Sequence, residues 1–137
     1  MKRLDMLIRA RQWQLDERRR QVADLEVSVD LTLARIRSLD SSIDSEARLA
    51  DQVGPGAGFA AYAAGVRERR SKLVATLETL EAELAQARDL VAEAFQDLKK
   101  FELVQESRRS RERAVAAHRE QFALDEIAAL RHRAHRG

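Results

Sequence analysis

The sequence predicts an all-α protein in which two long helices form an antiparallel coiled-coil hairpin, the second helix being longer and overhanging the first. The only proline and three of the five glycines lie in one segment, residues 54–58. Proline lacks an amide donor and glycine favours turns, so a helix ends there. Apolar residues recur every three or four positions on both sides of that segment, as in a coiled coil. Aromatic residues make up 4% and charged residues 35% of the chain, a composition typical of long helices.

The first helix is predicted over residues 2–53, and its apolar seam has two positions in each heptad. The first position is apolar throughout: Ile8, Leu15, Val22, Val29, Ile36, Ile43 and Ala50. The second is mixed: Leu4, Arg11, Arg18, Leu25, Thr32, Leu39 and Glu46. The two arginines weaken the seam near the N-terminus, because polar residues at seam positions cost stability.

The turn is predicted over residues 54–58 and the second helix over residues 59–134, so that residues 1–137 form a single hairpin. Its seam includes Phe59, Val66, Leu73, Leu77, Leu80, Leu84, Ala87, Val91, Ala94, Leu98 and Phe101. The seam then decays, although no helix breaker follows before Gly137. If the turn centres on Gly56, residues that face each other have numbers adding to about 112, and residues beyond roughly 110 overhang the first helix.

The net charge of +2 conceals an uneven distribution. Residues 1–20 carry seven Lys/Arg and three Asp/Glu, and residues 108–137 carry eight and four. Two segments are acidic: residues 21–53 carry three Lys/Arg and seven Asp/Glu, and residues 71–107 carry four Lys/Arg and eight Asp/Glu. Residues 54–70 carry three Lys/Arg and one Asp/Glu. A hairpin would therefore have one strongly basic end, where residues 1–20 and 108–137 meet, an acidic shaft and a mildly basic tip.

The overhang carries an apolar stripe without an internal partner, formed by Phe122, Ile127 and Leu130 with Ala123. It is either a docking face for another protein or a frayed tail that associates non-specifically. The arginine clusters 18–20 and 108–113 have three interpretations: a solvated face, a surface for an acidic protein, or a phosphate-binding surface. Interleaved acidic residues and the lack of base-stacking aromatics argue against nucleic acid.

Near the turn, Phe59, Tyr62 and Val66 share one helical face. They either close the hairpin tip or anchor a partner. Trp13 lies off the seam and is either a contact residue or a side chain lying along the surface.

Catalysis and cofactors are not predicted. The chain has no cysteine, which excludes thiolate chemistry, and its glycine-rich segment precedes neither a lysine nor a strand. His132 and His135 have helical spacing but no third ligand nearby, so we predict no metal site. No apolar stretch reaches the roughly 18 residues of a membrane span, and the N-terminus lacks a signal-peptide core. We therefore expect a soluble, cytoplasmic chain.

Three segments resemble the FliJ family of the bacterial flagellar type III export apparatus. The first is the C-terminal run Arg119-Glu120, Leu124-Asp125-Glu126-Ile127-Ala128, Arg131 and Arg133. The second is the Phe59, Tyr62, Val66 pattern, and the third is the N-terminal Leu4, Leu7-Ile8-Arg9 and Arg11. The turn is shorter than the resemblance leads one to expect.

The resemblance implies a non-enzymatic stalk, monomeric on its own, at the inner face of the cell membrane. The end that bears both termini would insert into the ring of the export ATPase FliI, and a face near the turn would contact the export gate FlhA. Export chaperones are further implied partners; nucleic acid and membrane insertion are not. The implied ATPase contacts are Arg9, Arg11, Arg108, Arg109, Arg111, Arg113, Phe122, Leu124, Asp125 and Ile127, and the implied gate contacts are Phe59, Tyr62 and Val66. A structural or adaptor coiled coil that self-associates or bridges proteins is the alternative.

Overall fold

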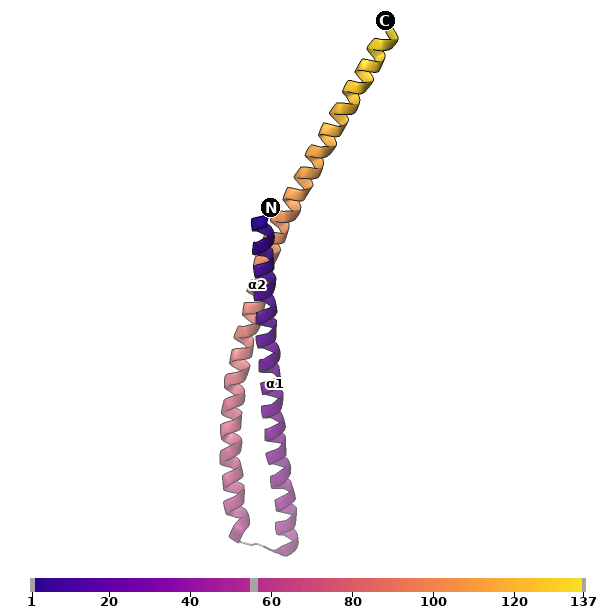
Figure 1. Cartoon of the computed structure of the whole chain (residues 1–137). Helices are drawn as coiled ribbons and strands as arrows, with labels where there is room; N and C mark the ends of the chain where they lie inside the picture. The colour runs from indigo at the N-terminus through magenta and orange to yellow at the C-terminus, as the bar shows by residue number, and fades with distance from the viewer. Residues whose placement is uncertain (1, 55–56, 137) are drawn as a thin grey trace. The chain divides into compact units, whose positions relative to one another are not determined.

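The computed structural model describes residues 2–54 and 57–136, and it confirms the all-α prediction. Helix α1 spans Lys2–Val53 and helix α2 spans Ala57–Arg136. No strand occurs in these two described ranges. Where the two helices lie side by side they run antiparallel (Figure 1).

Glycine ends α1. Gly54 has a φ of +92°, in the left-handed region that L side chains rarely adopt, and its amide donates a hydrogen bond to the carbonyl of Ala50 over 2.9 Å. A left-handed glycine that satisfies a free carbonyl is a common helix C-cap.

Helix α2 begins two residues before the predicted start at residue 59 and ends two residues beyond the predicted end at 134. Ala57 favours helix, and Gly58 is tolerated in the first turn, where helical hydrogen bonding is incomplete in any case. The predicted turn 54–58 is therefore too long by two residues at its C-terminal side. Pro55 and Gly56, on which that prediction depended, lie outside the described residues.

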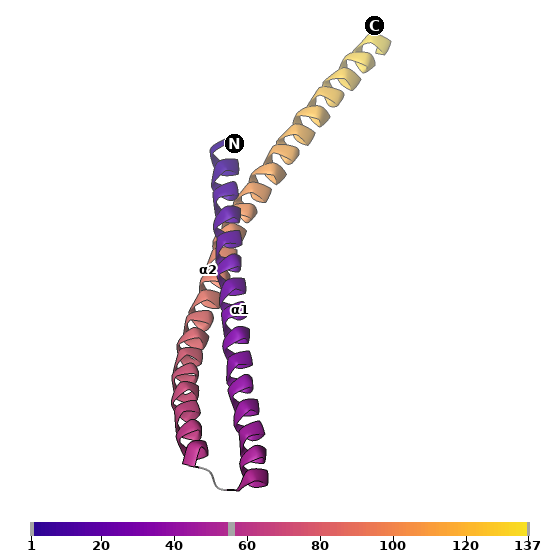
Figure 2. The ribbon, with the colours of Figure 1, turned by 60° about the horizontal axis from the view of Figure 1, so that its bottom comes forward.

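The chain divides into two compact units, and the assignment of residues 1–137 to a single domain stays a prediction. Unit 1 comprises residues 1–12 and 95–137, and unit 2 comprises residues 13–94. In unit 2 the two helices pack along a mostly apolar seam, and the views in Figures 1 and 2 agree on their pairing. Its buried residues are Leu15, Thr32, Ile36, Ala63, Val66, Leu84, Ala87 and Ala94.

In unit 1 the start of α1 packs on α2 through Leu4, Ile8 and Leu98, all buried. Gln105 Nε2 donates a hydrogen bond to Asp5 Oδ1 over 2.6 Å, and the guanidinium of Arg11 lies 5.5 Å from the ring centre of Phe101. After residue 105 every described residue of α2 is exposed. Figure 2 shows α2 continuing past the N-terminal end of α1 with no second segment beside it.

The predicted register is confirmed within each unit. Four pairs of side chains interact between the helices: Asp5 with Gln105, Arg11 with Phe101, Glu26 with Arg88, and Asp40 with Arg70. Their residue numbers add to between 110 and 114, against the predicted value of about 112. The predicted seam of α1 is buried or half-buried at every position except Glu46, which is exposed.

Within the described ranges, neither helix contains a stretch that is long and apolar enough to cross a membrane.

Candidate functional site

The C-terminal extension, which we define as residues 106–136, is a bare helix. All its residues are exposed, so its helicity depends on intrinsic propensity and on local pairs. Two such pairs are Arg113 with Glu106, at 3.0 Å, and Gln121 Nε2 donating to Asp125 Oδ1, at 3.1 Å. A helix without a packing partner is marginal in water and gains stability from any surface that covers it.

All the predicted ATPase-contact residues lie in unit 1. Nine of the ten are exposed. The exception is Arg11, which is half-buried and stacked over Phe101. Arg11 therefore takes part in the packing between the helices. Less of its side chain is accessible to a partner protein than at the exposed Arg9.

The exposed side chains of the extension are not confined to one face. Successive helical residues are about 100° apart, so Arg108, Arg109, Arg111 and Arg113 point in different directions around the axis. Further along, the exposed apolar residues spread over more than half of the circumference by the same geometry. They are Val115, Phe122, Leu124, Ile127 and Leu130. A flat partner would cover only part of this surface, whereas an enclosing partner would cover all of it.

Beside the turn, α1 and α2 form a hollow of about 420 Å³. Phe59 and Tyr62 line it from α2, and both are half-buried. Leu49 and Val53 line it from α1 and are 52% and 85% exposed. Neither residue was among the predicted contacts: Leu49 lies off the seam, and Val53 continues its second position seven residues after Glu46. One sequence feature could have identified them: α1 ends on apolar residues that the predicted register places opposite Phe59.

Val66 differs from the other two residues of its predicted group. Its exposed fraction is 0%, so its side chain fills the hairpin core and presents nothing to a partner in this conformation. Val66 and Phe59 lie on the same face of α2, and at residue 66 this face packs against α1. The tip surface is therefore better described by Phe59, Tyr62, Leu49 and Val53.

Trp13 is 65% exposed and lies on the outer side of α1. Val27 and Leu31, also exposed, lie on the same helical face, because 14 and 18 residues are close to whole numbers of turns. We call these three residues the outer apolar face of unit 2; Glu17, Arg20 and Asp24 lie on the same side between Trp13 and Val27.

His118, His132 and His135 are exposed residues of the extension. In the described ranges no group of three or more His, Asp or Glu side chains is placed to hold a metal ion.

The folded hairpin also gathers a basic cluster that the charge count along the chain detected only in part, as the mildly basic segment 54–70. Residues 35–40 of α1 and 67–72 of α2 lie across from each other in unit 2, as the Asp40–Arg70 ion pair at 2.8 Å shows. Together they hold six Lys/Arg and two Asp/Glu. The predicted register, applied to charged residues as well as to apolar ones, would have found this cluster within the acidic shaft.

Comparison with known proteins identifies what the chain is similar to. Residues 1–137 match the protein family described as Flagellar FliJ protein. Two curated relatives from Caulobacter vibrioides carry the same description, one from strain NA1000 / CB15N and one from strain ATCC 19089 / CIP 103742 / CB 15. Each is 31% identical over 102 residues, which cover 73% of this chain and 73% of the relative. No solved structure matches the chain.

Proposed function

The chain belongs to the flagellar FliJ family, and from that premise we propose that it is a non-enzymatic stalk of the flagellar protein export apparatus. In this role the C-terminal extension binds the export ATPase FliI within its ring, and the tip of the hairpin contacts the export gate FlhA. The protein would act in the cytoplasm, at the inner face of the membrane, and would also meet export chaperones there.

The observation that carries the proposal is the all-round exposure of the extension. A ring of subunits encloses whatever enters it, and the extension offers arginines in several directions and apolar residues over more than half of its circumference. Arginine forms bidentate contacts with carboxylates, and burial of exposed apolar side chains contributes about 25 cal/mol per Å². Because the extension would bind the assembled ring and not the separate subunits, it would favour assembly by mass action.

The gate contact is supported by the hollow beside the turn. Val53 and Leu49 expose apolar surface, and the half-buried Phe59 and Tyr62 supply aromatic walls. Aromatic residues at the edge of an apolar hollow are typical anchors of protein interfaces.

The test is ATP hydrolysis by purified FliI with and without this chain, over a range of FliI concentrations. We expect stimulation that is greatest where FliI alone is mostly disassembled, and that is lost when residues 108–137 are removed. The paired variant Phe122→Ser with Ile127→Ser should weaken stimulation, since both side chains are exposed and no internal packing is lost.

Tyr62→Ala provides the matched control. It should leave ATPase stimulation unchanged and weaken binding to the cytoplasmic part of FlhA. An active FliI that the full-length chain does not stimulate at any concentration contradicts the stalk proposal.

The adaptor alternative is favoured by one observation, the outer apolar face of Trp13, Val27 and Leu31. If this face rather than the extension is the working surface, Trp13→Glu abolishes association with a partner while truncation at residue 107 does not.

A further inference from the structure

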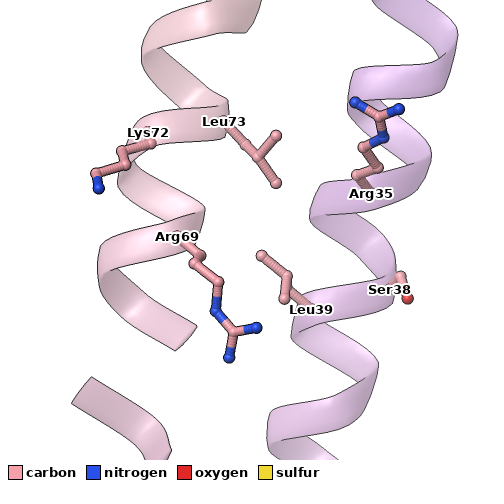
Figure 3. A pocket seen from close by; sticks show the side chains of 6 residues that line it. All are labelled: Arg35, Ser38, Leu39, Arg69, Lys72 and Leu73. Carbon is pink, nitrogen blue, oxygen red and sulfur yellow. The ribbon is translucent and has the colours of Figure 1, made fainter. Parts of the chain in front are cut away.

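A groove lies between the two helices in the basic cluster of unit 2. Its volume is about 420 Å³, and it is lined by Arg35, Ser38 and Leu39 of α1 and by Arg69, Lys72 and Leu73 of α2. Figure 3 shows Leu39 and Leu73 reaching towards each other from the two helices, with the side chains of Arg35 and Arg69 on either side of them. The groove thus has an apolar floor between two guanidinium groups.

The two leucines are only half-buried, although both are seam residues. Half-burial is common along the seam of unit 2, as at Leu25, Leu77 and Leu80, whereas Ile36 and Leu84 are buried. Part of each leucine side chain is therefore exposed in the groove, and an apolar side chain placed on Leu39 and Leu73 would lose water-exposed surface on both sides of the contact.

The positive charges around the groove are largely uncompensated. The two acidic residues of the cluster are already paired, Asp40 with Arg70 at 2.8 Å and Glu68 with Lys72 at 3.6 Å. Arg69 makes one long hydrogen bond, from Nε to the carbonyl oxygen of Gly65 at 3.5 Å. In the part of the chain that the structure describes, neither Arg35 nor Arg69 forms an ion pair.

The acidic helical segments next to the groove limit the length of the ligand. Residues 21–34 and residues 73–87 each carry three Asp/Glu and no Lys/Arg. An extended polyanion such as nucleic acid would leave the cluster and meet these carboxylates, and no aromatic residue lines the groove for base stacking. A short ligand with a few carboxylates avoids that repulsion.

We propose that this groove is a binding site for a short acidic peptide segment of a partner protein. An apolar side chain of the segment lies on Leu39 and Leu73, and carboxylates on either side of it accept hydrogen bonds from Arg35 and Arg69. Arginine suits this arrangement because its planar guanidinium pairs with a carboxylate through two parallel hydrogen bonds.

The proposal depends on unit 2 alone. It shares no residue with the ATPase-contact or gate-contact candidates, so failure of the export proposal would leave it untouched, and the reverse also holds.

The test is a titration of the full-length chain into a fluorescein-labelled peptide that carries one leucine flanked on each side by two glutamates, followed by fluorescence anisotropy. We expect saturable one-to-one binding. Arg35→Ala and Arg69→Ala should each weaken it about tenfold, because each removes a charge-assisted contact.

Arg37→Ala is the matched control. It removes the same charge from the same helix and the same cluster, but Arg37 does not line the groove, so affinity should stay within about twofold of the parent value. A peptide with serine in place of leucine should bind more weakly than the parent peptide. Circular dichroism of each variant establishes that the helices are retained.

Several results would overturn the proposal. Equal weakening by Arg37→Ala and Arg35→Ala would indicate diffuse charge attraction and not a groove. Equal binding of the serine peptide would remove the role of the apolar floor. Absence of saturable peptide binding, or tighter binding of duplex DNA or phosphatidylserine vesicles through the same arginines, would reject an acidic peptide as the ligand.

Discussion

At the scale of single residues, the polar seam residues Thr32 and Arg11 are tolerated because each has a partner within the folded chain. Thr32 is buried, and its hydroxyl donates a hydrogen bond to the carbonyl of Ser28 over 2.8 Å. Arg11 places its charged group over the ring of Phe101, where the electron-rich face of the ring attracts a cation. Neither residue leaves a buried polar atom without a partner in the described chain.

Substitution of Val66 and of Val53 by alanine tests which residues near the turn belong to the packed core. Val66→Ala should lower the free energy of unfolding by about 2 kcal/mol, because it leaves a cavity at a fully buried site. Val53→Ala should change it by less than about 0.5 kcal/mol, because Val53 is exposed. Urea denaturation followed by circular dichroism measures both. A similar cost for the two variants would place Val53 in the packed core and contradict the assignment.

At the scale of the elements, α2 has two parts that are stabilised differently. Up to residue 105 it is held against α1 by the seam, and beyond that residue it has only its own backbone hydrogen bonds and local side-chain pairs. The interhelical ion pairs add little, because Arg70 with Asp40 and Arg88 with Glu26 are roughly half exposed to water. Apolar packing therefore stabilises the hairpin, and the charged pairs help to set its register.

Removal of residues 108–137 should change the free energy of unfolding of the remaining chain by less than about 1 kcal/mol, because every described residue removed is exposed. The far-ultraviolet helical signal per molecule should fall with the residues removed, while the urea midpoint stays the same. A large drop in the midpoint would mean that the extension stabilises the hairpin, contrary to its exposure.

At the scale of the whole molecule, the proposed binding surfaces are divided between the two units. The extension belongs to unit 1, whereas the tip hollow and the basic groove belong to unit 2. Each surface can therefore be altered by substitutions that leave the other unit intact, which is what separates the experiments proposed above.

We predict that the isolated chain is a monomer, because each unit already buries its seam internally. Light scattering after size-exclusion chromatography should give the chain mass of 15.6 kDa at micromolar concentration. A mass of twice that value, restored to the monomer mass by Trp13→Glu, would show that the outer apolar face joins two copies and would favour the adaptor alternative.

The sequence by itself determined the helices, their antiparallel pairing and their register. These follow from local rules: the Gly-Pro segment interrupts helix formation, and the four–three spacing of apolar residues decides which faces meet. The tertiary structure alone decided how far each side chain is buried and which charges come together. It placed Val66 in the core, Arg11 against Phe101, and Arg35 and Arg69 along one groove, since burial and charge clustering depend on residues that are distant in the chain and come together only when the helices pack.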